Sequence, residues 1–368
     1  MTFSTDHNAN RIVFLDVARG IGILFVLLVH NVWSNSRTST VIFNFHMPLF
    51  YFLSGVLFST PVDTNLKSAF QRAFRVLAPF PFFSVLACSV FLASPELLKV
   101  ASKKMLLTFI VHGEPWFDKP LWFFVSLSFV CFVFSFFARF LSGNQVRIKR
   151  IAFLFACGSL AWLSSTTAPA FRKMWSPGMI ATVPFGLFWF GLGFFVKGFM
   201  LRLARAKMSS FLLLALAVAF ALVLSAGADI SAKPDIRTAR MGSWRLFPLS
   251  LCGIAAVLLS VLAIPTRLLR PLQFIGRNSV IYFALEFVSF PFVARIIHFA
   301  IPNYRHFQIA EQTAAWQTLA AVAAQLAVLS ALTPLVMPLL ARFRSLAEDA
   351  IFGPETTLLL RRHPTNST

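Results

Sequence analysis

Long apolar runs separated by short polar segments make up most of the chain. A helix needs about 20 mostly apolar residues to cross the hydrocarbon of a bilayer, and continuous apolar runs without period-2 alternation favour helices over a barrel. The sequence therefore predicts an all-α polytopic membrane protein with about ten transmembrane helices. The predicted spans are residues 12–33, 41–60, 74–94, 120–141, 150–167, 179–199, 211–229, 246–264, 278–301 and 314–340.

Charge refines this picture. The chain is 58% hydrophobic and only 12% charged, yet its formal net charge is +20. Such an excess would suit nucleic-acid binding, but the Lys and Arg residues fall between the apolar runs and form no dense tract. More of them lie on the predicted loops that share a side with the N-terminus, which places both termini in the cytoplasm. Topology is therefore the main reason for the excess, and attraction to anionic lipid headgroups or to an anionic substrate accounts for the remainder. We expect membrane lipids as partners and no nucleic acid.

The first predicted span retains three groups that hydrocarbon penalises, Asp16, Arg19 and His30. Residues eleven apart on a helix differ in direction by roughly 20°, so Arg19 and His30 share a face and lie roughly 16 Å apart along the axis. Asp16 is three residues before Arg19, close enough to pair with its guanidinium. Such a polar stripe should face the bundle interior or a water-filled cavity. The alternative is an ion pair that locks helix packing, with His30 as an interfacial histidine.

A second histidine, His46, stands where the next span begins, in the stretch "FNFHMPLFYFLSG". Two histidines at one end of neighbouring helices could line the same cavity, and neutral imidazole is a competent general base near neutral pH. Ser54 and Gly55, later in this span, would allow another helix to approach closely. The four cysteines lie inside apolar runs without CxxC or Cys/His spacing, so we expect no metal site.

The stretches "RIVFLDVARGIGILFVLLVH" and "FHMPLFYFLSG" resemble the integral-membrane acyltransferase-3 family. Members of that family carry an Arg, ten residues and then a His in the first helix, which Arg19 and His30 match. A His-Met-Pro-Leu-Phe…Ser-Gly element at the second helix is matched from His46 to Gly55. "PLWFF" at 120–124 and "IGRNSVIYF" at 275–283 are similar to two later elements of the family.

The resemblance implies transfer of an acyl group, usually acetyl from acetyl-CoA, to a hydroxyl of a carbohydrate or glycolipid acceptor. His30 would then act as general base or briefly carry the acyl group, Arg19 would orient the donor, and Asp16 would fix Arg19. His46 would either assist in the same cavity or only cap the second helix. The family also implies the bacterial inner membrane, and acceptors such as O-antigen, exopolysaccharide or lipo-oligosaccharide nodulation signals.

Several other residues have two interpretations. Arg72 and Arg75 could contact the donor phosphates, or they could belong to an ordinary positive-inside loop. Trp116 and Trp122 could stack on a sugar ring, but interfacial anchoring is the commoner role of Trp. Glu286 stands near the position where members of the family often have a histidine, and we expect it to face the interior with a polar partner.

A single transmembrane acyltransferase domain is expected at residues 1–341, followed by a cytoplasmic tail at 342–368. The family resemblance is to its stand-alone membrane form. A carrier or flippase for a lipid-linked glycan is the main competing hypothesis, in which the polar stripe lines a substrate path and no bond is made. A membrane scaffold without catalysis is a third.

Overall fold

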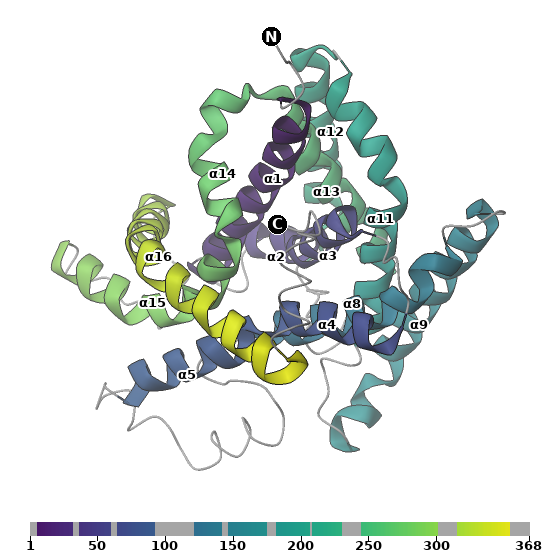
Figure 1. The fold of residues 1–368 in the computed structure, drawn as a ribbon. Coiled ribbons are helices and arrows are strands. Elements are labelled where there is room, and N and C mark those ends of the chain that lie inside the picture. Colours follow the sequence, from purple (N-terminus) through teal and green to yellow (C-terminus); the bar gives the residue numbers. More distant parts are fainter. Residues whose placement is uncertain are drawn as a thin grey trace, which may run out of the picture.

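The computed structural model describes residues 6–31, 37–59, 65–92, 121–141, 146–174, 182–206, 208–229, 244–300 and 315–353 (Figure 1). Every regular element in these ranges is a helix, which confirms the all-α prediction. The helices are α1 (Asp6–Asn31), α2 (Arg37–Phe43), α3 (His46–Leu57), α4 (Leu66–Leu77), α5 (Pro79–Leu92), α8 (Trp122–Phe140), α9 (Val146–Met174), α11 (Val183–Arg205), α12 (Ser210–Gly227), α13 (Leu246–Ala263), η3 (Thr266–Leu269), α14 (Arg270–Arg277), α15 (Ser279–Ala300) and α16 (Ala315–Phe352).

Eight segments of the described chain are long and apolar enough to cross a membrane. They are Val13–Asn31, Arg37–Leu57, Leu66–Val90, Trp122–Phe140, Val183–Arg205, Ser210–Gly227, Leu246–Ala263 and Thr318–Phe352. Each overlaps one of the ten predicted spans. The remaining two predicted spans, 150–167 and 278–301, lie in α9 and α15, which are helical but are not among the eight. The polytopic architecture is therefore confirmed.

Two predicted boundaries differ from the helix ends. The third predicted span begins at residue 74, inside α4, because this amphipathic helix carries its own polar face before the chain turns at Ala78 into α5. The domain boundary expected at residues 341 and 342 falls inside α16, which continues to Phe352 despite Pro334 and Pro338 within it. Gly353 follows with φ at 82°, a left-handed conformation that glycine adopts without strain.

Helices α3 and α11 touch backbone to backbone, because each has a glycine at the crossing. A Cβ on Gly55 would lie 1.9 Å from the carbonyl oxygen of Phe190, and a Cβ on Gly193 would lie 2.1 Å from that of Phe52. Neither glycine can therefore be replaced without separating the helices. The close approach expected at Gly55 is confirmed, and the aromatic rings of Phe58 and Phe190 meet edge to face beside it.

A second close crossing joins α1 to α14. A Cβ on Gly20 would lie 2.0 Å from the carbonyl oxygen of Leu272, and a Cβ on Gly276 would lie 1.7 Å from that of Asp16. These contacts run α14 antiparallel to α1, since residue 272 faces residue 20 and residue 276 faces residue 16. The crossing brings the end of α14 to the polar part of the first span.

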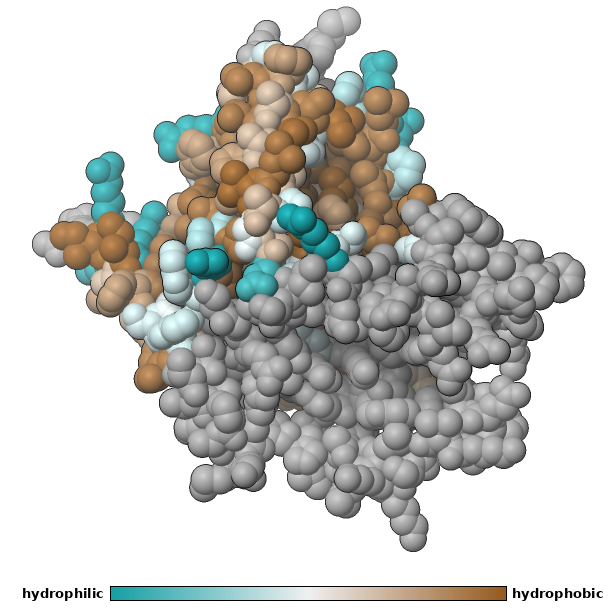
Figure 2. All heavy atoms as spheres, turned by 180° about the vertical axis from the view of Figure 1, so that it is seen from behind, coloured by the Kyte–Doolittle hydropathy of each residue, from teal (hydrophilic) through white to brown (hydrophobic). Residues whose placement is uncertain are grey.

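The outer surface is apolar where a lipid-facing surface is expected. Figure 2 shows a nearly continuous hydrophobic covering over the described part of the face opposite to Figure 1, with hydrophilic residues gathered at a few places. Helix α12 contributes most clearly, since Phe211 is 82% exposed. Its other exposed large apolar side chains are Leu212, Leu214, Leu216, Val218, Leu222 and Val223. In water such a surface would drive aggregation, whereas in a bilayer it meets lipid tails.

Candidate active site

His30 lies in the last turn of α1 and shares a hydrogen bond with Glu286 of α15, through Nδ1 of the imidazole and Oε1 of the carboxylate. The Glu286 side chain is 0% exposed, whereas that of His30 is 28% exposed. The carboxylate is therefore hidden behind the imidazole, and the imidazole edge remains accessible. The expectation that Glu286 faces the interior with a polar partner is confirmed, and the partner is His30.

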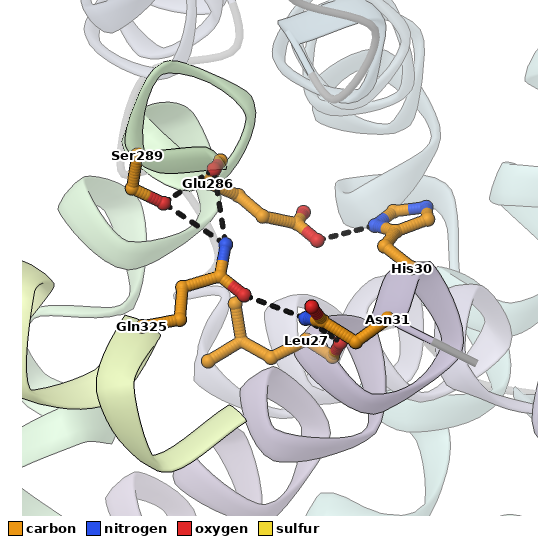
Figure 3. Close-up of polar contacts among 6 residues, drawn as sticks. All are labelled: Leu27, His30, Asn31, Glu286, Ser289 and Gln325. Atoms are coloured by element: carbon orange, nitrogen blue, oxygen red, sulfur yellow. Dashed lines mark hydrogen bonds and ion pairs between the residues drawn. The ribbon is translucent and has the colours of Figure 1, made fainter. Parts of the chain in front are cut away.

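Figure 3 shows that this pair belongs to a polar network between α1, α15 and α16. Nε2 of Gln325 donates to the carbonyl oxygen of Glu286 at 3.0 Å and to the Ser289 hydroxyl at 2.9 Å. Nδ2 of Asn31 donates to Oε1 of Gln325 at 2.7 Å and to the carbonyl oxygen of Leu27 at 2.8 Å. The buried Gln325 thus holds the backbone that carries Glu286 against the end of α1.

One oxygen of Glu286 has no partner in this network. Oε2 is buried, and no side chain or backbone group of the described residues donates to it. A carboxylate held in this way depends on the Nδ1 hydrogen of His30 for its stabilisation, since burial of an unpaired charge is costly. The same bond fixes the orientation of the imidazole ring.

His46 occupies the first turn of α3 and is buried. Its Nδ1 donates to the carbonyl oxygen of Ile42 in α2 at 2.9 Å, so it joins α2 to α3 and does not cap α3. Of the two roles left open for His46, the cap of α3 is not formed, because Nδ1 donates to a carbonyl and does not accept from the free N–H groups of the first turn. The assisting role stays a prediction. The imidazole lies within electrostatic reach of His30.

Asp16 does not pair directly with Arg19, contrary to the sequence expectation. Its Oδ2 instead accepts a hydrogen bond from Nε of Arg277 in α14, at 3.2 Å. The close crossing of α1 and α14 brings this distant arginine nearer than the local one. Arg19 is partly buried and remains within electrostatic reach of the Asp16 carboxylate. Two arginines therefore share one buried carboxylate.

Arg72 and Arg75 lie one turn apart on α4 and have different partners. Nη1 of Arg72 donates to the carbonyl oxygen of Ser59 at 2.8 Å, and its guanidinium lies 5.2 Å from the centre of the Phe58 ring. Nε of Arg75 lies 3.4 Å from Oε1 of Glu348, near the end of α16. Arg72 thus binds the carbonyl of Ser59, two residues after the end of α3, while Arg75 reaches a carboxylate of α16.

The histidines and the arginines lie at opposite ends of the first helices. Phe25 of α1 meets Phe45, just before α3, with ring centres 5.2 Å apart, and Gly22 faces Phe50, so α1 and α3 run antiparallel. His30 and His46 share one end as a result. Asp16, Arg19 and the arginines of α4 lie toward the other, and eleven residues of helix separate Arg19 from His30 by roughly 16 Å.

The remaining candidates have simpler outcomes. Trp122 is buried and packs against Phe123, so it belongs to the core and not to a lipid interface. Trp116 lies outside the described residues. Within the described ranges no three His, Cys, Asp or Glu side chains converge as metal ligands.

The fold and the site together define a polytopic helical membrane protein with a histidine–carboxylate pair suited to acid–base chemistry. The family model described as an acyltransferase domain matches residues 12–334, so the chain belongs to the acyltransferase-3 family. It is a membrane acyltransferase, which takes an acyl donor and an acyl acceptor as substrates. Comparisons with the curated proteins and with the solved structures gave no match.

Proposed function

We propose that this acyltransferase moves an acetyl group from acetyl-CoA to a hydroxyl of a cell-surface or secreted glycan. The observation that carries the proposal is the hydrogen bond between His30 and the buried Glu286. A carboxylate that accepts from Nδ1–H leaves the imidazole lone pair on Nε2, which is the arrangement of a general base. Glu286 then acts as a positioning residue for His30.

In the proposed reaction Nε2 of His30 takes the proton of the acceptor hydroxyl while the hydroxyl oxygen attacks the thioester carbonyl. The new ester bond forms, the carbon–sulfur bond breaks, and the proton passes from His30 to the sulfur of CoA. The second route is acyl transfer to His30 followed by attack of the acceptor. Both routes need the imidazole to be neutral at the start, and both release free CoA with a thiol.

The positions of the charged groups support a donor that enters from the arginine end. CoA carries several phosphate charges on one end of a long flexible arm, and guanidinium groups bind phosphate well. Arg19, Arg72 and Arg75 would bind or orient that end, and His30 lies roughly 16 Å farther along α1. His46, at the same end as His30, would assist the base. We further propose that residues 1–341 form the membrane-embedded part of the catalytic domain and that the segment after residue 341 lies on the cytoplasmic side.

Sidedness follows from the same proposal. The acetyl donor is a cytoplasmic metabolite, so the arginine end and both chain termini would face the cytoplasm, in agreement with the distribution of Lys and Arg. The enzyme would then reside in a bacterial inner membrane. Its acceptor would be O-antigen, exopolysaccharide or a lipo-oligosaccharide signal such as a nodulation factor.

Labelled acetyl transfer by membranes that contain His30→Ala tests the proposal. General-base assistance supplies about 10²–10⁴-fold, so we expect a loss of that size at normal protein level. Activity close to that of the unchanged protein would refute the role of His30. Release of free CoA only when acceptor is present supports the transferase, whereas glycan movement without CoA release would establish a carrier or flippase instead.

A further inference from the structure

The last turns of α16 are docked onto α4. Phe352 meets Phe70 and Phe74 edge to face, with ring centres 5.9 and 5.6 Å apart. One turn before Phe352, Glu348 reaches Arg75 at 3.4 Å. In Figure 1 the end of α16, in yellow, crosses the molecule toward α4. The C-terminal helix therefore packs on α4 through Phe70 and Phe74 and brings Glu348 to Arg75.

Positive charge exceeds negative charge at this contact. Arg72 and Arg75 are three residues apart on α4, and Arg344 and Glu348 are four apart on α16, so each pair shares a face of its helix. Arg344 is within electrostatic reach of Glu348, and Arg72 within reach of Arg75. Two guanidinium groups, those of Arg75 and Arg344, thus lie near the Glu348 carboxylate, and the guanidinium of Arg72 lies near that of Arg75. We refer to Arg72, Arg75, Arg344 and Glu348 as the cationic cluster.

The Glu348 carboxylate leaves hydrogen-bond donors of the cationic cluster without a good acceptor. A charge-assisted hydrogen bond between a guanidinium and a carboxylate spans about 2.7–2.9 Å, whereas Nε of Arg75 lies 3.4 Å from Oε1 of Glu348. Nε of Arg344 is buried, and no acceptor among the described residues reaches it. A buried donor without an acceptor is costly, and a guanidinium offers five N–H groups in a planar fork. The cluster holds more donors than one carboxylate can use.

A phosphate group matches these donors better than a carboxylate. It has more acceptor oxygens and up to two negative charges, and arginine forks bind it through paired hydrogen bonds. Nη1 of Arg72 already donates to the Ser59 carbonyl, so Arg75 and Arg344 have more donors left for a new ligand than Arg72 has. Glu348 lies between them and competes for the same donors.

We propose that Arg344 is a further phosphate-binding residue of the donor site and that Glu348 is its built-in competitor. When the phosphates of CoA arrive, they take the place of the Glu348 carboxylate beside Arg75 and Arg344. The identity of the donor as an acyl-CoA rests on the proposed function, but the preference for an organic phosphate follows from the cluster itself. The end of α16 would therefore set how tightly the donor binds, without touching the reacting atoms.

Direct binding of CoA to the full-length protein in nanodiscs of phosphatidylcholine tests this proposal. We expect Glu348→Gln to tighten CoA binding at least about fivefold, because the competing charge is removed. Arg344→Gln should weaken it about tenfold, because a charge-assisted contact is lost. Arg342→Gln, on the exposed side of the same helix, should leave the dissociation constant unchanged and controls for a general loss of positive charge.

Two further measurements keep the outcome clear. Arg344→Lys retains the charge but loses the planar fork, so its affinity for CoA should lie between those of the unchanged protein and Arg344→Gln. It takes the place of Arg344→Gln if that variant is unstable, and it should then bind CoA more weakly than the unchanged protein. The same variants in nanodiscs with phosphatidylglycerol distinguish a lipid headgroup from CoA. Unchanged or weaker CoA binding by Glu348→Gln would overturn the proposal, and so would a gain seen only for the anionic lipid. Because binding is measured without acceptor, tighter binding together with absent hydroxyl acetylation would refute the proposed function alone.

Discussion

Nε of Arg277 donates a hydrogen bond to Oδ2 of Asp16 at 3.2 Å, across the close contact between α14 and α1. The two partners differ greatly in environment, because the Asp16 side chain is 6% exposed and that of Arg277 is 60% exposed. An exposed ion pair contributes about 0–1 kcal/mol. The Asp16 carboxylate should contribute more to stability than Arg277, because it also lies near the partly buried Arg19.

Replacement of the two partners should therefore have unequal effects on stability. Asp16→Asn leaves Arg19 without a nearby negative charge and should lower the free energy of unfolding by about 3 kcal/mol. Arg277→Gln should lower it by no more than about 1 kcal/mol. Thermal unfolding of the purified proteins in detergent measures both. Equal effects would contradict the view that Asp16 serves two arginines.

Glu286→Gln should reduce the turnover number about 10²-fold or more while the Michaelis constants for donor and acceptor stay within about twofold. The amide has the shape of the carboxylate but no charge, so it would hold neither the tautomer of His30 that the proposed reaction needs nor the positive charge that the ring would gain in it. Steady-state kinetics of the proposed acetyl transfer provide the measurement. A change confined to the Michaelis constants would assign Glu286 to substrate binding instead of positioning.

Gly20→Ala and Gly276→Ala should each destabilise the protein strongly, by about 2 kcal/mol or more. The new methyl group would lie 2.0 or 1.7 Å from a backbone carbonyl oxygen of the facing helix, so α1 and α14 must separate. Gly198→Ala is the matched control, because no atom lies within 4 Å of its added Cβ. There the higher helix propensity of alanine should be neutral or slightly stabilising. Thermal unfolding in detergent compares the three variants.

Gln325→Met should impair catalysis as well as stability. The substitution keeps the volume of the side chain but removes the hydrogen bonds to Asn31, Ser289 and the backbone of Glu286. We expect a loss of about 1–3 kcal/mol in stability and a lower turnover number, because Glu286 loses its support.

Ser330→Ala is the control for Gln325→Met. It removes the hydrogen bond between Ser330 of α16 and Tyr282 of α15, 2.6 Å long, without affecting any bond to α1. Its turnover number should stay unchanged at equal protein level. A similar fall in turnover for both variants would show that α15–α16 packing alone, and not the link to α1, controls catalysis.

The positions of the helices were predictable because, in a bilayer, amino-acid composition largely determines which segments form spanning helices. A buried segment in lipid must satisfy its own backbone hydrogen bonds, so a run of about 20 apolar residues has few alternatives to a spanning helix. Gly55 was predictable for a related reason, since close contact between membrane helices requires small side chains. Periodicity also placed Arg19 and His30 on one side of α1 without knowledge of the rest of the fold.

Partner choice was not predictable from the sequence. The nearest candidate for Asp16 was Arg19, three residues away, whereas the bonded arginine is Arg277 in another helix. Glu286 was expected to have a polar partner, but nothing in the sequence joined it to His30. Both pairs depend on how α14 and α15 pack on α1, and periodicity within one helix carries no information about that packing.

The hydrogen bond between His30 and Glu286 also links α1 to α15. Under the proposed function, an acceptor that separated α1 from α15 would break this hydrogen bond and leave His30 without the group that orients it. The proposed acceptor would therefore have to approach the opposite edge of the imidazole while α1 and α15 stay in contact. Entry of the acceptor and orientation of the proposed base would then depend on the same hydrogen bond.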